Sequence, residues 1–226
     1  GQADALRQEL GTLTSLPIGW MINTHFHWDH TWGNARFPEA ELWGHDKCRE
    51  EMIVHGETAR HEVLDWIPDE HRAAVEEVEI TPPTNTFSEH ASINIGRRVE
   101  LTYCGRGHTN SDIVVHVDDV LFAGDLLEEG APPSFGDSYP LDWETTVGNI
   151  GLRDTIVPGH GDAVDRDFVS AQHDELRAVA ELARRGHSEG MRIEQLAQRG
   201  PYPPATMQTA LTRAYAQLDG ELRVGS

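Results

Sequence analysis

The densest chemistry in the sequence lies in one segment of six residues, His25-Phe-His27-Trp-Asp29-His30. Four of these side chains carry an imidazole nitrogen or a carboxylate oxygen, which are ligand atoms that zinc-like cations take. In an extended segment, His25 and His27 leave the backbone on the same side because alternate side chains share a face. We expect the chain to turn into a helix at Asp29 and His30, so that these two face a second position beside the first. The alternative is a polar loop with chance histidines.

Three further residues of the same chemical types follow apolar strands. His108 lies in Gly105-Arg-Gly-His-Thr-Asn110, Asp125 ends Val120-Leu-Phe-Ala-Gly-Asp125, and His160 ends Ile156-Val-Pro-Gly-His160. Taken singly, His108 and His160 read as polar turn residues, and Asp125 reads as a turn residue or a helix N-cap. A buried aspartate at a strand end nevertheless needs a partner or a metal. Together, four strand ends that deliver only His and Asp indicate a metal site.

Strands and helices predicted from the hydrophobic pattern must position these residues. Helices are expected at 3–13, at 45–78 with an interruption at Pro68, and at 142–152, 165–185, 190–199 and 203–219. Strands are expected at 18–22, 40–44, 84–87, 91–95, 97–104, 112–117, 119–124 and 154–161. This mixture predicts an α/β architecture. Because no repeat or linker interrupts it, we predict one domain over residues 1–226, with C-terminal helices at about 165–223 included.

Composition excludes several classes of partner. The chain has 38 acidic and 18 basic residues, a formal net charge of -20, which disfavours nucleic acid as a partner. No apolar run approaches the roughly 20 residues that span a bilayer, so no membrane partner is expected. The first residues lack the basic start and apolar stretch of a signal peptide. The two cysteines, Cys48 and Cys104, suit a reducing compartment, and we expect a cytoplasmic protein.

The order HxHxDH, GH, GD and PGH resembles the metallo-β-lactamase superfamily over roughly residues 5 to 175. The resemblance implies a four-layer αβ/βα sandwich with a metal site at one edge. It also implies two metal ions, expected to be Zn²⁺, with iron or manganese as alternatives. The implied ligands of the first metal are His25, His27 and His108; those of the second are Asp29, His30 and His160; Asp125 bridges the two.

Some positions depart from the family or point to different branches of it. Asp125 stands where the cysteine-containing lactamases have Cys, which resembles the glyoxalase II and lactonase branches, whereas residues 105–115 look lactamase-like. The flavodiiron branch is disfavoured because it has Glu at the position of His27. The family's first strands are absent before the first predicted helix, so we expect an N-terminally truncated version of the fold. Its exposed sheet edge leaves a homodimer open.

The expected function is hydrolysis of a small-molecule substrate. Two cations roughly 3.5–4 Å apart can share a hydroxide of near-neutral pKa, which attacks a carbonyl of an ester, thioester, lactone or β-lactam. Asp29 and Asp125 are assigned as catalytic residues besides being ligands. The alternatives are a mononuclear iron oxidoreductase of the persulfide dioxygenase type, a non-catalytic binding or scaffold protein or inactive metal-binding fragment, and a nuclease or phosphodiesterase, for which the net charge disfavours long nucleic acids but not a small phosphodiester.

Several neighbouring side chains have two interpretations. Four aromatic residues near the predicted ligands could line a substrate wall or simply pack in the core: Trp28, Trp32, Phe135 and Tyr139. Asp112 could hydrogen-bond a ligand histidine or cap a turn. Cys104 is expected to be a small packed residue.

Overall fold

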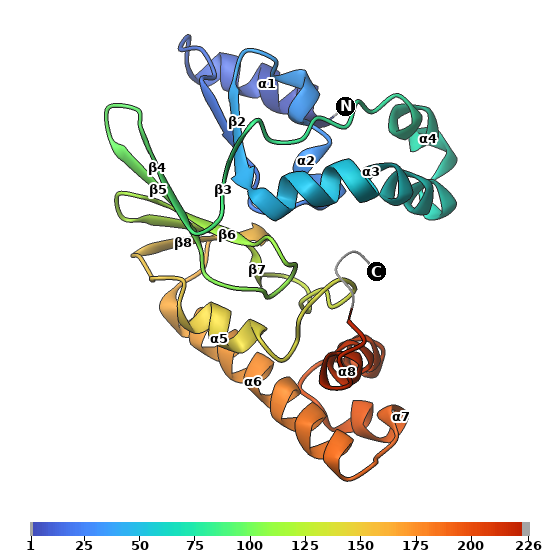
Figure 1. Cartoon of the computed structure of the whole chain (residues 1–226). Helices are drawn as coiled ribbons and strands as arrows, with labels where there is room; N and C mark the ends of the chain where they lie inside the picture. Colours follow the sequence, from blue (N-terminus) through green and yellow to red (C-terminus); the bar gives the residue numbers. More distant parts are fainter. Residues whose placement is uncertain (1, 223–226) are drawn as a thin grey trace. The chain divides into compact units, whose positions relative to one another are not determined.

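The computed structural model describes residues 2–222 and divides into two compact units, residues 1–88 and residues 89–226 (Figure 1). Each unit contains one sheet and its own helices. Residues 1 and 223–226, where the predicted domain and its C-terminal helices reach their limits, lie outside the described part. The mixed α/β class predicted from the sequence is confirmed in both units, and the single domain over 1–226 stays a prediction.

The first unit is built on a short parallel sheet with strand order β1-β2-β3. Its strands are β1 (Trp20–Ile22), β2 (Glu41–His45) and β3 (Asn85–Phe87), preceded by helix α1 (Gln2–Leu13). Parallel neighbours need long crossover connections. The first crossover carries α2 (Trp28–Thr31) and the 3₁₀ turn Asn34–Arg36, and the second carries α3 (Asp46–Trp66) and α4 (Asp69–Glu76). The predicted ligand segment therefore lies directly after β1.

Helix α3 begins and ends where local chemistry dictates. His45 stands at its N-cap, and the His45 side chain accepts a hydrogen bond from the backbone N–H of Lys47. The helix ends before Ile67, whose backbone is extended at φ -65 and ψ 140. Proline disfavours helical backbone in the residue that precedes it, which is Ile67 here. The predicted interruption at Pro68 is therefore confirmed.

The second unit is built on a five-stranded mixed sheet with strand order β4-β5-β6-β7-β8. The strands are β4 (His90–Asn94), β5 (Arg98–Tyr103), β6 (Ile113–Val117), β7 (Val120–Glu128) and β8 (Thr155–His160). The first four run antiparallel to their neighbours, and β8 joins β7 in parallel. The predicted turn between β6 and β7 is present, with Asp118 at φ 51. Aspartate is among the residues that tolerate this left-handed conformation.

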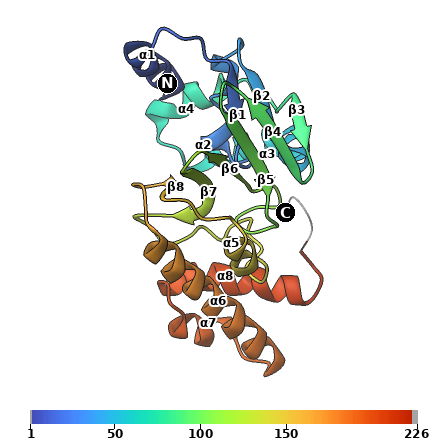
Figure 2. The same cartoon turned by 90° about the vertical axis from the view of Figure 1, so that its left-hand side faces the viewer.

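The helices of the second unit pack together on the core of that unit. They are α5 (Trp143–Gly148), α6 (Arg166–Ser188), α7 (Ile193–Leu196) and α8 (Pro204–Leu218), with a 3₁₀ turn at Ala197–Arg199. Helix α6 runs beside α5 and α8 (Figures 1 and 2). The predicted helix at 142–152 is shorter and ends at Gly148; Asn149 already has non-helical backbone, at φ -108 and ψ 3. Within residues 2–222, the helices include none with the length and apolar character that a membrane crossing requires.

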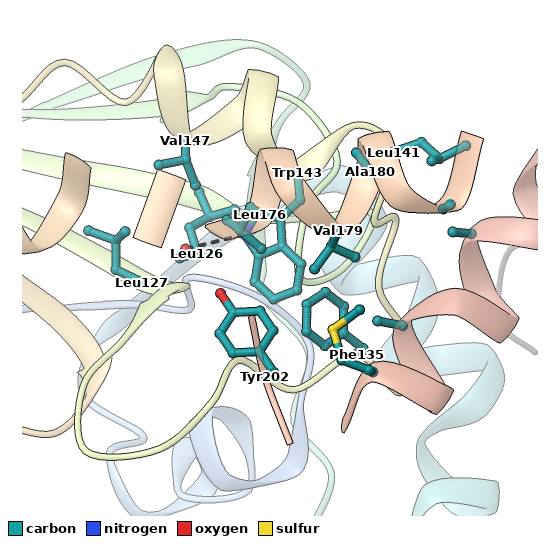
Figure 3. Close-up of a cluster of buried hydrophobic side chains, with 14 of the residues drawn as sticks. Leu126, Leu127, Phe135, Leu141, Trp143, Val147, Leu176, Val179, Ala180 and Tyr202 are labelled. Carbon is teal, nitrogen blue, oxygen red and sulfur yellow. Dashed lines mark hydrogen bonds between the residues drawn. The ribbon is translucent and has the colours of Figure 1, made fainter. Parts of the chain in front are cut away.

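The core of the second unit joins the sheet to these helices. Leu126 of β7, Trp143 of α5 and Leu176 of α6 are almost completely buried, and Figure 3 shows them in one cluster with Phe135 and Tyr202. Burying side chains of this size contributes roughly 1.5–3 kcal/mol each to folding. The second half of β7, where Asp125 lies, is thus anchored in the apolar core of the second unit.

Candidate metal centre

The first cluster of predicted ligands lies between β1 and α2, within the first unit. His27 has extended backbone, at φ -60 and ψ 151, and helix α2 begins at the next residue. Asp29 and His30 therefore lie in the short helix α2, as the sequence predicted. The Nε2 atom of His25 lies 3.1 Å from Nδ1 of His27, and the ring centroids of His25 and His30 are 4.3 Å apart. Three imidazoles thus converge, with His25 buried.

Asp29 is held as a carboxylate by its neighbour. Its Oδ2 atom lies 3.4 Å from Nε2 of His30. Burial alone would raise the pKa of Asp29. The hydrogen bond and charge of His30 outweigh burial and lower this pKa to about 2. Because metal ligands must be deprotonated, Asp29 is ready to bind a cation at neutral pH.

A pair of buried asparagines holds this segment, and sequence reasoning missed it. The Asn34 amide nitrogen donates to Oδ1 of Asn23 at 2.8 Å and to the carbonyl of Thr81 at 2.9 Å. The Asn23 amide in turn donates to Oδ1 of Asn34 and to the carbonyl of His30, at 3.1 and 3.2 Å. The available signal was the position of two asparagines on either side of HxHxDH, since a buried amide needs partners.

The second cluster lies in the second unit and has Asp125 at its centre. The Oδ2 atom of Asp125 lies 3.5 Å from Nε2 of His108 and 3.4 Å from Nε2 of His160. His108 and Asp125 are buried, whereas the side chain of His160 is 46% exposed. The ligands come from the loop after β5, the strand β7 and the end of β8. Two segments distant in the sequence therefore each direct a histidine nitrogen at one carboxylate oxygen of a third segment.

The hydrogen bond behind His108 fixes which nitrogen faces Asp125. Nδ1 of His108 lies 3.2 Å from the carbonyl of Ser134, and a carbonyl only accepts, so Nδ1 carries a proton. A neutral His108 then directs its Nε2 lone pair toward the carboxylate. A proton or a cation must lie between two such electron-pair donors. An imidazole with its outer N–H on a carbonyl is a common arrangement for a metal ligand, so these residues fit a metal ion.

Glycines next to two of these ligands are required by close packing. A Cβ at Gly107 would lie 2.6 Å from a methyl carbon of Leu126, and a Cβ at Gly159 would collide with the Asp125 carboxylate. The glycines next to His108 and His160 therefore make room for Leu126 and Asp125.

The other singled-out residues have simpler surroundings. Phe135 and Tyr139 are buried, which favours the interpretation that they pack in the core. Asp112 accepts hydrogen bonds from the backbone N–H and the hydroxyl of Thr109, at 2.8 and 2.6 Å, and so holds the turn after His108. Burial raises the pKa of Cys104 to about 11, so its thiol stays protonated and unreactive at neutral pH.

Trp28 is the first residue of α2, and Trp32 directly follows this helix. Their rings are 5.4 Å apart, and Trp28 also contacts the ring of Trp66, at 5.9 Å. Both tryptophans are half-buried, so they take part in packing and still have exposed surface.

Comparison with known proteins decides the family. The sequence profile of the metallo-beta-lactamase superfamily matches residues 7–177. The chain belongs to the metallo-β-lactamase superfamily. A metallo-beta-lactamase type 2 from Bacillus cereus is 33% identical over 81 residues, which is 32% of each chain. A type 2 enzyme from a Bacillus species, strain 170, is 32% identical over the same length and coverage. The chain thus spans about a third of the length of these curated relatives.

Solved structures show the fold of this metallo-β-lactamase superfamily member. A metallo-beta-lactamase from Pontibacter korlensis superposes with a TM-score of 0.60 at 19% identity, covering 77% of this chain and 76% of the other. FIM-1 from Pseudomonas aeruginosa, in a mono-zinc form, superposes with a TM-score of 0.57 at 20% identity, covering 79% and 74%. The predicted sandwich class of the metallo-β-lactamase type is confirmed by these neighbours.

Proposed function

We propose that this chain is a metal-dependent hydrolase that uses two zinc ions. The observation that carries the proposal is the convergence of His108 and His160 on Asp125, with His108 held in the tautomer of a metal ligand. The family match supports combining the two clusters, because residues 7–177 include all seven predicted ligands. In this proposal His25, His27 and His108 bind one ion, Asp29, His30 and His160 bind the other, and Asp125 binds both.

The chain's own groups have distinct parts in the proposed reaction. Bound divalent cations supply Lewis acidity and bring the pKa of water toward 7. Asp29, ionised at neutral pH, and Asp125, buried between two histidines, accept hydrogen bonds and orient the attacking water. The Ser134 carbonyl keeps His108 in one orientation.

The proposed substrate is a small ester, thioester, lactone or β-lactam. The names of the curated relatives make β-lactams the first class to test. Asp125 stands where the cysteine-containing lactamases have Cys, so lactones and thioesters are the next classes to test. The net charge of -20 disfavours nucleic acid substrates.

The test is metal content per chain, followed by a substrate panel. Protein purified without added metal should hold close to two zinc ions and hydrolyse at least one of the four substrate classes. His90→Ala, an exposed histidine of the second unit, is the control and should keep both properties. About one iron per chain would favour the iron oxidoreductase. Absence of bound metal together with absence of turnover would overturn the proposal.

Two further proposals concern location and assembly. The chain has two cysteines, too few for a disulfide framework, which suits a reducing compartment and supports a cytoplasmic protein. In the described sheet of the first unit, β1 pairs only with β2, and Trp20 on β1 is 42% exposed. Exposed edges of this kind promote association, so we propose a homodimer. Light scattering of the purified protein tests it, and a monomeric mass at high protein concentration would contradict it.

A further inference from the structure

The strand that carries Asp125 leaves the regular ladder at this residue. Strand β7 pairs with β8 at Phe122↔Val157, then at Gly124↔Pro158, and next at Glu128↔His160, with register shifts between these pairs. From the first to the last of these pairs, β7 advances by six residues while β8 advances by three. The pairing of β7 with β6 on its other side ends at Phe122. Asp125 therefore projects from a bulge, and the backbone groups that follow it need other partners.

Side chains supply those partners. The Gln172 amide nitrogen donates to the carbonyl of Leu126 at 3.0 Å, and the Gln172 amide oxygen accepts from the backbone N–H of Glu128 at 3.1 Å. The indole N–H of Trp143 donates to the same Leu126 carbonyl at 3.2 Å (Figure 3). A primary amide offers one acceptor and a donor, as a peptide group does. Gln172 therefore acts in place of a missing strand along the bulge.

The position of Gln172 in its helix strengthens this interpretation. Buried residues of α6 recur at helical spacing at Val169, Leu176 and Val179, and Gln172 lies in the same stripe at 4% exposure. A polar side chain in an apolar stripe costs free energy unless its hydrogen bonds are made. Here both amide atoms bond to backbone that directly follows a predicted metal ligand.

We propose that Gln172 is a positioning residue for Asp125: its amide fixes the β7 bulge and so aims the Asp125 carboxylate at His108 and His160. The inference rests on the proposed metal site, because its consequence is the affinity of that site. Without the amide, the Leu126 carbonyl keeps only Trp143 and the Glu128 N–H loses its acceptor. The bulge can then shift, and Asp125 loses its fixed direction.

The experiment compares Gln172→Met with Val179→Ala. Methionine keeps the length of the side chain and removes both hydrogen bonds, whereas Val179→Ala weakens the packing of the same helix and leaves the bulge bonds intact. In metal-free protein, we expect the Glu128 amide to exchange its hydrogen at least about 10-fold faster in Gln172→Met than in Val179→Ala. Competition with a chelator should show zinc affinity about 10–100-fold weaker in Gln172→Met and near wild type in Val179→Ala.

The outcomes separate this inference from the function it rests on. Equal Glu128 exchange in the two variants would overturn the role of Gln172, whether or not the chain binds zinc. Wild-type protein without zinc affinity would overturn the proposed function, and the exchange rates would still decide the bulge. Faster exchange with unchanged zinc affinity would make Gln172 purely structural and overturn the inference.

A second variant covers the case in which Gln172→Met does not fold. Gln172→Glu keeps an acceptor for the Glu128 N–H and loses the amide donor. It should protect the Glu128 amide and bind zinc with an affinity between those of wild type and the range expected for the methionine variant. Wild-type zinc affinity in Gln172→Glu, or an unprotected Glu128 amide, would contradict the proposal.

Discussion

The two clusters of predicted ligands are built in different ways. In the first unit, four ligands lie within six consecutive residues, and a local turn with a reciprocal asparagine pair holds them. In the second unit, three ligands come from three distant segments and meet at the Asp125 carboxylate. The first cluster is therefore set by local backbone geometry. The second depends on strand register and on side chains of α5 and α6 that replace missing ladder bonds.

This difference predicts unequal sensitivity to substitution. In the first cluster, loss of one support leaves neighbouring ligands tethered by the short chain between them. In the second cluster, His108 and His160 come from distant segments and both face Asp125. We therefore expect the most severe effects in the second unit and smaller ones in the first.

The largest effect is expected for Asp125→Asn. The side chain keeps its shape but loses the charge that faces two histidines, so a cation there is no longer balanced. Substitution of a residue that only supports a metal ligand weakens metal affinity by up to roughly 100-fold. The zinc affinity of Asp125→Asn should fall by more than this, and hydrolysis should be lost. Chelator competition measures it, with Asp118→Asn as the control, because Asp118 is an exposed turn aspartate whose conformation asparagine also tolerates. Equal affinity in both variants would remove Asp125 from the site.

The first cluster was the part of the site most open to prediction from sequence. HxHxDH alternates and then turns into a helix within one crossover, so its geometry follows from neighbouring residues. The apolar strands that lead to Asp125 and His160 were also predictable, since their runs have few other interpretations. The predicted end of β7 was too early, at residue 124, because a bulge that continues to Glu128 has no sequence period.

The supports of the second cluster were not open to prediction. Gln172 lies in the helix predicted at 165–185, and nothing near it in the sequence indicates that its amide bonds to the backbone of β7. The same holds for Ser134, whose carbonyl faces His108 from a loop rich in Gly and Pro. Such contacts join residues 26 to 46 positions apart, and they depend on how the unit folds.

The second largest effect is expected for Gly159→Ala, which tests how tightly β8 packs on Asp125. A Cβ here collides with the carboxylate and lies 2.9 Å from the Asp125 backbone nitrogen, so strand or ligand must move. Overpacking of this kind costs about 3 kcal/mol, the upper part of the usual range. Chemical denaturation of metal-free protein measures it.

Gly136→Ala is the matched control for that substitution. Nothing lies within 4 Å of a Cβ at Gly136, and its backbone has no left-handed φ, so its stability should stay near wild type. If Gly159→Ala were as stable as Gly136→Ala and bound zinc normally, the second cluster would tolerate substitution. That result would contradict the expectation that the second cluster is more sensitive to substitution than the first.

A smaller effect is expected for Asn34→Ala in the first unit. The substitution removes the partner of the Asn23 amide and leaves both ends of that buried side chain with fewer bonds. The cost is about 2 kcal/mol of unfolding free energy, typical of a buried polar group that loses its partner. Asn94→Ala, at an exposed asparagine, is the control. Zinc affinity should fall less than in Gln172→Met, and a larger fall would reverse the predicted order of the two clusters.

The smallest effect concerns pH and His45, which caps α3. The Nε2–H of His45 donates to the carbonyl of Ser88 at 2.9 Å, and Nδ1 accepts from the Lys47 N–H at 3.2 Å, so the folded ring is neutral. Burial lowers the pKa of His45 below its usual 6.5, and the bond to Ser88 offsets this only in part. The stabilisation is therefore complete above about pH 6.5 and is lost as pH falls toward the lowered folded pKa.

The slope from this single group is at most about 1.4 kcal/mol per pH unit. Chemical denaturation of wild type and His45→Gln below about pH 6.5 isolates the contribution of His45 to this slope, because the variant has no imidazole at this position to titrate. His71→Gln, at an exposed histidine of α4, should keep the wild-type slope. If His45→Gln kept that slope as well, the acid sensitivity of the first unit would come from another group, and His45 would be only a neutral helix cap.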